Sequence, residues 1–365
     1  MKAIVSGGGS GGHIFPAVAI ANAIKKRWPE ADILFVGAEG RMEMEKVPVA
    51  GYEIKGLPIA GLQRKLTPQN IIKNLQLPFR MMQSNHRVKA ILREFQPDIV
   101  VGVGGLASEP TLKAAAGLGF PTLLQEQNSY AGLTNKLLAK DARTICVAYE
   151  GMERFFPKEK IVFTGNPVRA AIEQMNCTRE EGLRYFDLNP DQPVILVVGG
   201  SLGARSLNGM MLHEIETNSD KPVQVIWQTG RWGYEEAANA SRGVTRVKVH
   251  EFIQRMDLAY AAADVIISRA GAIAISELCI VGKPVVLVPS PNVAEDHQTK
   301  NAMALVNKGA ALMVSDAECG TQGIKAAEEL LGDKDRMAAM SEAISKMAVR
   351  GAADKIVDEI EKIIK

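Results

Sequence analysis

One histidine follows a run of glycines close to the start of the chain, in the segment SGGGSGGHIFP at residues 6–16. Backbone N–H groups of a glycine-rich turn can approach an anion closely, and the dipole of a helix that starts there strengthens the attraction. Histidine adds a group that exchanges protons near neutral pH. We therefore predict a phosphate-binding turn with a titratable group, His13, at its mouth.

The surrounding residues predict the elements that hold this turn. Ala3-Ile4-Val5 is an apolar run typical of a buried strand, and apolar residues recur at helical spacing after the turn. Gly7, Gly9 and Gly12 also satisfy the dinucleotide pattern G-x-G-x-x-G, which many unrelated turns match. A nucleotide-binding dehydrogenase or regulator therefore stays open, although its fingerprint has no need of His13.

A second glycine turn, Gly199-Gly200-Ser201-Leu202-Gly203, follows the apolar run Pro193–Val198. It predicts another phosphate cradle, in which Ser201 adds a hydroxyl donor. Ser268-Arg269 follows a later strand, and Glu277 lies in the apolar helix after it. A carboxylate near a strand end can accept hydrogen bonds from both ribose hydroxyls, so we favour ribose binding over a solvated helical glutamate.

Two further segments follow strands in the first half of the chain. Gly102–Ser108 is a third glycine turn, after the strand at Asp98–Val101. Gln125-Glu126-Gln127-Asn128 follows the next strand, and four consecutive polar residues are poor core material. Loops at strand ends commonly carry function, so we predict a functional loop here, with a plain connecting loop as the alternative.

Two acidic features are better explained as helix caps than as ligand sites. Asp296 precedes a helix, and we expect it to cap that helix while Gln298 faces the ligand site. Asp333-Lys334-Asp335 is the only D-x-D in the chain, a pattern that binds metal in some enzymes. It also precedes a helix, so we expect a cap and no metal there.

Composition indicates large hydrophobic cores and excludes several classes of partner. Hydrophobic residues make up 47% of the 365 residues, charged residues 23%, and the net charge is only +2. We expect two domains and no nucleic-acid partner. The four cysteines are widely spaced and the five histidines form no ligand cluster, so we predict reduced thiols, no metal and no cofactor. No signal peptide or membrane span is recognised, which favours a cytoplasmic protein.

Apolar strands alternate with helices along the whole chain. Near-continuous Val, Ile and Leu runs separated by helices indicate parallel sheets covered on both faces. The pattern restarts after Gly165-Asn166-Pro167, where Thr178-Arg179-Glu180-Glu181 predicts a capping box. We predict an α/β fold with two Rossmann-like domains, residues 1–165 and 166–350, whose sheets face each other across a cleft. The later strands are expected at residues 31–36, 98–103, 122–125, 144–148, 161–164, 193–198, 223–227, 246–249, 265–268 and 285–288.

Taken together, these segments resemble the MurG family, the N-acetylglucosaminyltransferases of peptidoglycan synthesis. Residues 8–16 match its opening signature G-G-[ST]-G-G-H-x-x-P. The resemblance covers essentially the whole chain and implies the GT-B architecture, which a few epimerases and phosphorylases share. The other matching segments are residues 102–105, 125–128, 165–169, 199–208, 251–253, 268–277 and 297–302.

The resemblance places the donor, UDP-N-acetylglucosamine, on the second domain and the lipid-linked acceptor on the first, which the helix at 351–365 joins. Leu106 and Glu109 depart from the family pattern, which more usually has an aromatic residue and a glycine there. The implied donor contacts are uracil with Arg169 and the Ile253 backbone, phosphate with Ser201, ribose with Glu277, and sugar with Ala272 and Gln298. The implied acceptor contacts are Ser10, Gly11, Gly12, His13 and Asn128.

The implied reaction is an inverting transfer of N-acetylglucosamine to the 4-hydroxyl of the muramyl sugar on undecaprenyl diphosphate, which converts lipid I to lipid II. Glycine-turn amides, a helix N-terminus and Arg269 are expected to stabilise the leaving UDP. His13 is the candidate base, and Glu126 is the next candidate. A UDP-N-acetylglucosamine epimerase of the same architecture remains the alternative enzyme.

The stretch from Ile54 to Arg93 contains eight Lys or Arg residues and no Asp or Glu. Within it, Leu75, Phe79 and Met82 recur at helical spacing, and Pro78 is expected to separate two short helices. Apolar residues beside basic flanks suit shallow insertion into an anionic bilayer. We predict peripheral binding at the cytoplasmic face of the membrane. The alternative is an ordinary core helix, which we expect to account for Ile91 and Leu92.

Overall fold

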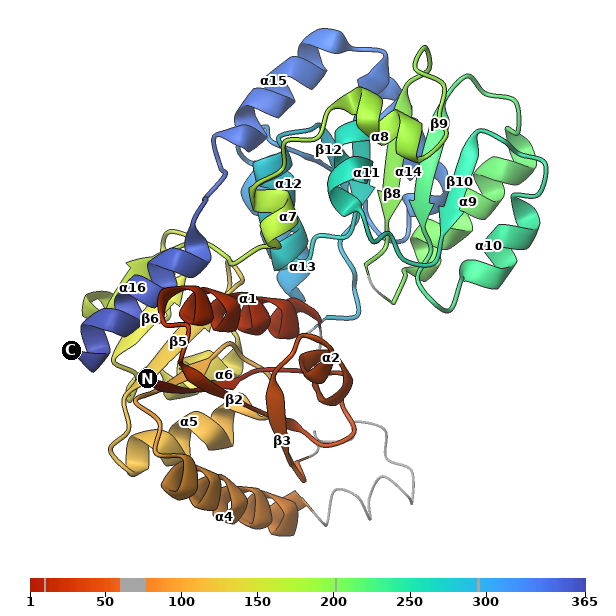
Figure 1. Ribbon diagram of the computed structural model, residues 1–365. Coiled ribbons are helices and arrows are strands. Elements are labelled where there is room, and N and C mark those ends of the chain that lie inside the picture. Colours follow the sequence, from red (N-terminus) through yellow and green to blue (C-terminus); the bar gives the residue numbers. More distant parts are fainter. Residues whose placement is uncertain (10, 60–76, 201, 294–295) are drawn as a thin grey trace. The chain divides into compact units, whose positions relative to one another are not determined.

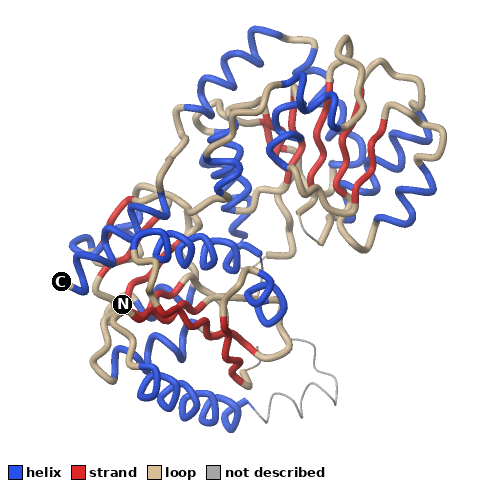
Figure 2. Tube along the Cα trace, in the orientation of Figure 1, coloured by secondary structure: helices blue, strands red, loops and turns tan. Residues whose placement is uncertain are grey.

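The computed structural model describes residues 1–9, 11–59, 77–200, 202–293 and 296–365. The chain divides into two compact units (Figure 1; Figure 2). Unit 1 comprises Met1–Val168 and Gly351–Lys365, and unit 2 comprises Arg169–Arg350. Each unit is an α/β domain built on one parallel sheet, which confirms the predicted fold class of two Rossmann-like domains.

Unit 1 holds a seven-stranded sheet, in the order β3-β2-β1-β4-β5-β6-β7 among the described residues. The strand order reverses between β1 and β4, the position at which such sheets bind ligands beyond the carboxyl ends of their strands. The strands are β1 (Lys2–Ser6), β2 (Asp32–Ala38), β3 (Glu53–Leu57), β4 (Ile99–Gly102), β5 (Thr122–Glu126), β6 (Thr144–Val147) and β7 (Ile161–Phe163). The helices are α1 (Gly11–Arg27), α2 (Glu43–Val49), α4 (Leu77–Phe95), α5 (Ser108–Gly117), α6 (Leu133–Leu138), α16 (Ala352–Ile364) and the 3₁₀ turns η1 (Met152–Arg154) and η2 (Lys158–Lys160).

Unit 2 repeats this design with six strands in the described part of the chain, in the order β10-β9-β8-β11-β12-β13. Its strand order reverses between β8 and β11. The strands are β8 (Val194–Val198), β9 (Gln224–Gln228), β10 (Val247–His250), β11 (Val265–Ser268), β12 (Val285–Leu287) and β13 (Leu312–Met313). The helices are α7 (Ala170–Glu173), α8 (Arg179–Tyr185), α9 (Arg205–Thr217), α10 (Tyr234–Ala240), α11 (Met256–Ala262), α12 (Ala272–Val281), α13 (His297–Val306), α14 (Cys319–Leu331) and α15 (Lys334–Ser345).

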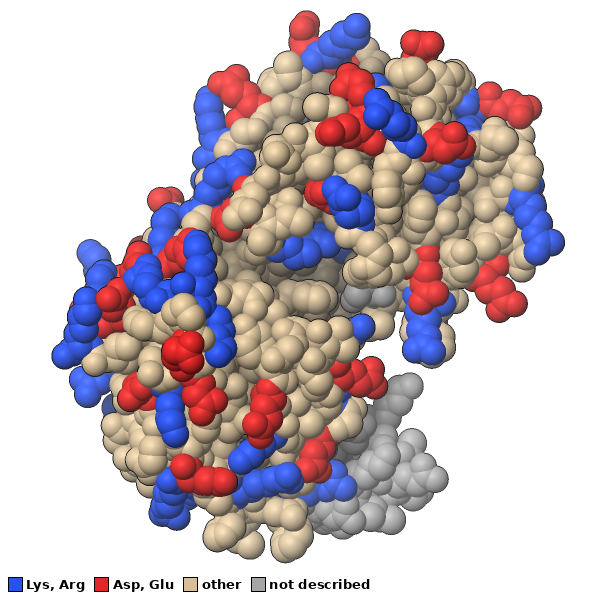
Figure 3. Space-filling view, viewed as in Figure 1, with Lys and Arg blue, Asp and Glu red and all other residues tan. Residues whose placement is uncertain are grey.

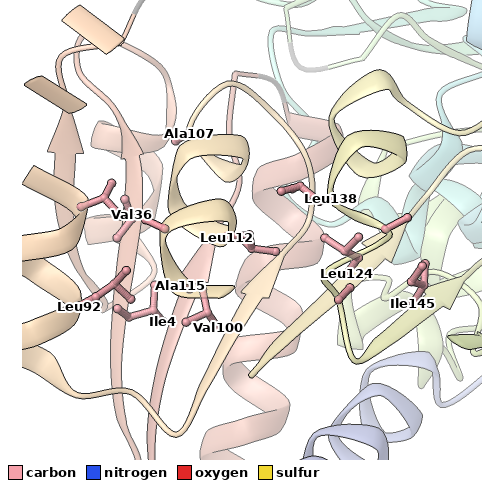
Figure 4. Packing of buried hydrophobic residues seen from close by; sticks show 14 of the residues in the cluster. Ile4, Val36, Leu92, Val100, Ala107, Leu112, Ala115, Leu124, Leu138 and Ile145 are labelled. Atoms are coloured by element: carbon pink, nitrogen blue, oxygen red, sulfur yellow. The ribbon is translucent and has the colours of Figure 1, made fainter. Parts of the chain in front are cut away.

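The sheet of unit 1 is buried on both faces, which explains the continuous apolar runs of its strands. Side chains alternate along each strand, so Ile4 lies on one face with Val100 and Leu112 (Figure 4). Helices α4, α5 and α6 cover this face. Ala3 and Val5 lie on the opposite face, beneath α1 and α16.

The last helix of the chain, α16, returns to unit 1 and lies beside α1 (Figure 1). Its inner residues Ile356, Val357 and Ile360 are at most 1% exposed. Exposed ion pairs contribute only about 0–1 kcal/mol each, so the buried apolar contacts hold the helix in place. Figure 3 shows both signs of charge interspersed over these helices, where the ion pairs are Lys26–Asp354, Arg27–Asp358 and Arg27–Glu361.

Two predicted helix caps are confirmed. The Thr178 hydroxyl accepts the Glu181 N–H at 3.2 Å, and the Glu181 carboxylate accepts the Thr178 N–H at 2.8 Å, which completes the capping box. The Asp333 carboxylate accepts the Arg336 N–H at 2.9 Å. Asp333 therefore starts α15 as a cap.

Of the two short helices expected to meet at Pro78, the first lies outside the described residues, and the second is the start of α4. Helix α4 runs without interruption from Leu77 to Phe95, and Pro78 lies in its first turn. A proline there is tolerated because the first N–H groups of a helix have no intrahelical partner. Ile91 and Leu92 are buried as predicted, and Leu75 lies outside the described residues.

Candidate functional site

The first glycine turn connects β1 to α1 at the point where the strand order of unit 1 reverses. Gly9 has a φ of 86°, a conformation that residues with a side chain rarely adopt. The third glycine turn lies against it, because the Gly8 N–H donates to the Gly104 carbonyl at 3.3 Å. A Cβ on Gly105 would lie only 2.4 Å from the Gly8 oxygen. The two turns therefore form one continuous backbone surface.

A buried glutamate that sequence reasoning missed, Glu43 of α2, fixes one side of this turn. It is 1% exposed, and its carboxylate accepts the N–H groups of Gly9 at 2.8 Å and Ala38 at 3.1 Å. A Cβ on Gly8 would lie 2.2 Å from the Glu43 carboxylate. Because Glu43 occupies the Gly9 amide, an external anion would meet the amides at the start of α1 instead.

Replacing Glu43 with alanine would leave the N–H groups of Gly9 and Ala38 without this acceptor. Ala38 is buried, and an unsatisfied buried group costs about 1–3 kcal/mol, so we expect Glu43→Ala to lower the free energy of unfolding by about 1–3 kcal/mol. Urea unfolding followed by circular dichroism measures this. Glu45→Ala, at an exposed position of the same helix, is the matched control. Equal stability of the two variants would contradict the role of Glu43.

His13 lies in the first turn of α1, close to the third glycine turn and to the polar loop after β5. Its Nδ1 is 3.1 Å from Gln127 Oε1, and a Cβ on Gly104 would lie 2.8 Å from the imidazole Cε1. Gly11 and Gly12 begin the same helix, whose first turn contains no acidic residue to offset the positive end of the helix dipole. The structure thus brings these three predicted site residues together, and Ser10 lies outside the described residues.

Glu126 shapes the loop that carries Asn128. It is 1% exposed, and its carboxylate accepts the Asn128 N–H at 3.0 Å and the Asn128 Nδ2 at 3.2 Å. It also accepts the Gly132 N–H at 3.0 Å and the Asn135 Nδ2 at 2.9 Å. A buried carboxylate that accepts four hydrogen bonds fixes this loop, which makes Glu126 less suited than His13 to the role of base.

In unit 2, Glu277 of α12 forms a bidentate ion pair with Arg169. The Arg169 Nε lies 2.7 Å from Oε1 and its Nη2 lies 2.5 Å from Oε2, while the Tyr260 hydroxyl donates to Oε2 at 3.5 Å. Burial alone would lower the pKa of Arg169, but the hydrogen bonds and charge of Glu277 raise it overall. Arg169 and Glu277, which are expected to contact uracil and ribose, therefore also bind each other.

A second buried acid of unit 2, Asp257, gives stability a dependence on pH. Hydrogen bonds from Arg255 lower the pKa of Asp257 from 3.8 to about 2, against the opposing effect of burial. Because the pKa is lowered in the folded state, this stabilisation is complete above about pH 4 and is lost as the pH falls towards 2. At neutral pH we expect Asp257→Asn to be about 1–2 kcal/mol less stable than the parent. This difference in stability should shrink progressively as the pH falls below about 4.

Urea titrations of the parent and of Asp257→Asn over this pH range measure the effect. Asp187→Asn is the matched control, because the Asp187 side chain is 98% exposed and pairs only at the surface with Lys248. The control should show no such trend. A stability difference for Asp257→Asn that stays constant with pH would contradict the assignment.

Gln228, at the end of β9, connects two loops expected to hold the donor. Its Nε2 donates to the Gly200 carbonyl at 3.0 Å, and its Oε1 accepts the Ile253 N–H at 2.9 Å. Sequence reasoning missed Gln228, although a glutamine that closes a buried strand is a detectable signal. Because the Ile253 N–H already donates to Gln228, a backbone contact from Ile253 to uracil would have to come from its carbonyl oxygen. Ser201 lies outside the described residues.

Arg269 is committed to contacts inside unit 2. Its Nη1 donates to the Val288 carbonyl at 3.0 Å, the Pro289 carbonyl at 3.3 Å and Asp316 Oδ1 at 2.6 Å. Its Nη2 donates to the Ser206 hydroxyl at 2.9 Å. The guanidinium thus connects the ends of the strands to α9, and the hydrogen bonds of Nη1 commit that end of it to unit 2.

Gln298 of α13 connects the loops that follow β11 and β12. Its Oε1 accepts the N–H groups of Ala270 at 3.2 Å and Ser290 at 2.9 Å, so its amide nitrogen is the group left to contact a sugar. Ala272 begins α12 after Gly271, without a side-chain cap. The first backbone N–H groups of α12 can therefore donate to an anion, as at other helix N-termini.

The expectation that Asp296 caps α13 is wrong. Asp296 has a φ of 53°, and its side chain makes no capping hydrogen bond to the helix. Its Oδ1 instead accepts the Thr299 hydroxyl at 2.7 Å. The left-handed backbone of Asp296 places its carboxylate beside the Thr299 side chain rather than over the first amides.

Of the residues that depart from the family pattern, Leu106 lies in the third glycine turn and Glu109 lies directly after it. Leu106 is 38% exposed, and Glu109, in the first turn of α5, lies 3.6 Å from Lys113. Within the described ranges, no three His, Cys, Asp or Glu side chains are grouped as metal ligands. In the same part of the chain, no helix is both long and apolar enough to cross a membrane.

Comparison with known families matches both units. The N-terminal domain of glycosyltransferase family 28 matches residues 3–147, and its C-terminal domain matches residues 194–356. The chain belongs to glycosyltransferase family 28. Within this family, the UDP-N-acetylglucosamine--N-acetylmuramyl-(pentapeptide) pyrophosphoryl-undecaprenol N-acetylglucosamine transferase of Parabacteroides distasonis is 56% identical, over 100% of this chain and 98% of its own. The enzyme of that name from Phocaeicola vulgatus is 54% identical, over 100% and 96%.

Solved structures agree with this family 28 assignment. The crystal structure of MurG from Acinetobacter baumannii has a TM-score of 0.77 and 27% identity, and 99% of each chain is covered. The predicted resemblance to the MurG transferases is thus confirmed. The UDP-GlcNAc 2-epimerase from Neisseria meningitidis has a TM-score of 0.66 at 16% identity, over 99% of this chain and 100% of its own. At that identity the likeness shows a common fold alone.

Proposed function

We propose that this protein is an inverting glycosyltransferase that moves N-acetylglucosamine from UDP-N-acetylglucosamine to the 4-hydroxyl of the muramyl sugar of lipid I, undecaprenyl-diphospho-N-acetylmuramoyl-pentapeptide. The product is lipid II. The observation that carries the proposal is the 52–56% identity over the full chain to transferases named for this reaction. The glycine turns at the reversal points of both sheets support it, because they offer amides to the diphosphates of acceptor and donor.

Incubation with radiolabelled UDP-N-acetylglucosamine and a short-chain analogue of lipid I tests the proposal. We expect label in the lipid product and release of an equal amount of UDP, both dependent on the acceptor. Conversion of the donor without acceptor would favour the epimerase. Calorimetric titration separates the dehydrogenase alternative, since we expect binding of UDP and none of NAD.

In the proposed reaction unit 2 holds the donor. Glu277 accepts a hydrogen bond from ribose at Oε1, whose second lone pair remains usable while Arg169 holds the carboxylate in place. Arg169 and the Ile253 carbonyl contact uracil, and Ser201 contacts phosphate. The sugar meets the first turn of α12 at Ala272 and the amide nitrogen of Gln298.

Unit 1 binds the acceptor and supplies the base. Ser10, the amides of Gly11 and Gly12, and Asn128 contact the acceptor diphosphate. His13 takes the proton of the 4-hydroxyl as that oxygen bonds to C1 of N-acetylglucosamine. The bond from C1 to the β-phosphate oxygen breaks on the opposite side, and UDP leaves with the electron pair. Backbone amides stabilise the charge that develops on it.

We also propose that α4 brings unit 1 to the cytoplasmic face of the membrane. Phe79, Met81 and Met82 in its first turns are 65%, 50% and 67% exposed, which is unusual for three neighbouring large apolar side chains. Two basic residues of this stretch form surface pairs with acidic residues that lie outside it in the sequence, Arg87 with Glu39 and Lys55 with Glu94. Exposed pairs of this kind are weak, so they leave the attraction to anionic lipid largely intact.

Binding to vesicles that contain anionic lipid tests the membrane surface. Combining Phe79→Ser with Met82→Ser is expected to weaken binding about tenfold or more, because two large side chains lose their apolar contact with lipid. Added salt should weaken the parent too. Val49→Ser is the matched control, since Val49 is 86% exposed in the same unit but lies outside the basic stretch. Equal binding to neutral vesicles, or no effect of the double change, would contradict the proposal.

A further inference from the structure

A buried chain of amide side chains leads from His13 into the core of unit 1. Gln127, Gln125 and Asn166 are each at most 2% exposed. Gln127 Oε1 lies 3.1 Å from the Nδ1 of His13. At its other end, the Gln127 Nε2 bonds to the Val103 carbonyl at 2.9 Å, the Gln125 carbonyl at 3.0 Å and the Gln125 Oε1.

Backbone carbonyls decide which end of the Gln127 amide faces the histidine. A carbonyl oxygen can only accept, so the amide nitrogen must face Val103 and Gln125 while the amide oxygen faces His13. The far end of the chain fixes the same orientation. Asn166 Nδ2 donates to the Gln127 carbonyl at 3.0 Å, its Oδ1 accepts Gln125 Nε2 at 2.9 Å, and Gln125 Oε1 is thereby left to accept from Gln127.

We infer that Gln127 is a positioning residue that holds neutral His13 with its proton on Nδ1, so that Nε2 carries the basic lone pair. The reason is that an amide oxygen has no proton to give, and Nδ1 must therefore be the donor. The inference rests on the proposed function, in which His13 is the base. During transfer the hydroxyl proton moves to Nε2, the Nδ1–H keeps its bond to Gln127, and the proton then passes from Nε2 to water.

The same contacts explain why an amide occupies position 127 rather than a carboxylate. A carboxylate would accept from His13 equally well, but its second oxygen would face the oxygens of Val103 and Gln125 without a proton to donate. Gln127→Glu should therefore fail to substitute for glutamine. The Gln127 Nε2 donates to acceptors in the core, and the Gln127 Oε1 accepts from the imidazole.

Nitrogen-15 NMR of the imidazole rings tests the tautomer directly in the full-length protein. The chain has five histidines, and the spectrum of His13→Ala identifies the signals of His13 by their loss. We expect a protonated Nδ1 and an unprotonated Nε2 in the neutral ring. A neutral His13 protonated on Nε2 would overturn the inference, whatever the activity of the protein.

Gln127→Met removes the acceptor and keeps the length of the side chain. We expect His13 to shift towards the Nε2–H tautomer that a free histidine prefers, and kcat to fall about 10- to 100-fold. KM for the donor should stay within about twofold, because the ground-state contacts of the donor are untouched. Gln322→Met, at an exposed position of α14, is the matched control.

An unchanged tautomer or an unchanged kcat in Gln127→Met would overturn the positioning role. The result is distinguishable from a failure of the proposed function. Full turnover in His13→Ala would remove the base itself, and with it the task of Gln127. If His13→Ala is inactive but neutral His13 in the parent carries its proton on Nε2, only the inference about Gln127 is overturned.

Discussion

Replacing His13 with alanine is expected to lower turnover by at least about 100-fold, because a positioned general base contributes roughly 10²- to 10⁴-fold. The affinity for UDP should change little, since His13 belongs to unit 1 and the proposed donor residues belong to unit 2. The transfer assay measures the first effect and calorimetry with UDP measures the second. Turnover lost together with UDP affinity would show that the substitution acts beyond the acceptor hydroxyl.

A matched control for this change is His213→Ala, at an exposed position of α9. It removes the same side chain from the surface of unit 2, so turnover and UDP affinity should both persist. If His13→Ala keeps most of its turnover, the imidazole is a structural part of the glycine turns. The base would then have to come from another group, and Glu126 is poorly suited because four donors already bind its carboxylate.

Glu277→Ala is expected to weaken UDP binding by about 1.5–3 kcal/mol, the range for hydrogen bonds to a charged group. This corresponds to roughly a 10- to 150-fold rise in Kd. The fold should survive, because the Arg169 side chain is 38% exposed and can reach water once its partner is gone. Calorimetry with UDP measures the effect, and unchanged affinity in the folded variant would remove Glu277 from the donor site.

The partner variant Arg169→Met should behave differently. Glu277 is only 4% exposed, so without Arg169 its carboxylate stays buried and unpaired. Removing one partner of a buried pair typically costs about 3–5 kcal/mol of stability. We expect thermal unfolding to detect this loss in Arg169→Met and a smaller one in Glu277→Ala. Glu329→Ala, exposed on α14, is the control for both measurements, and equal losses in the two variants would contradict this asymmetry.

The fold could be predicted from the sequence because its signals are local. Apolar runs such as Ile99–Gly102, and the glycine turns that follow such runs, each consist of consecutive residues. Strand β3 was missed because Glu53–Leu57 mixes charged and apolar residues, as a strand at the edge of the described part of the sheet can. Strand β13 has only two residues and no pattern to detect.

The candidate site was predictable where its residues follow strands, and unpredictable where a side chain works through a distant partner. Glu43 binds the Gly9 amide 34 positions away, and Gln228 binds the Ile253 amide 25 positions away. Nothing adjacent to either residue in the sequence identifies the partner that it binds. Arg269 shows the reverse: its place after a strand suggested a ligand contact, but Asp316 and three other acceptors from later or earlier segments hold it inside.

The position of α16 has a consequence for how the protein is made. Most of unit 1 precedes unit 2 in the chain, yet α16, which helps α1 to cover one face of its sheet, is synthesised after the whole of unit 2. Unit 2 is contiguous from Arg169 to Arg350, so all of its residues are available before α16 appears. Domains generally fold as units during synthesis, with the N-terminal one first. Here the order of completion is reversed, because the part of this face that α16 covers stays exposed until the whole of unit 2 has been synthesised.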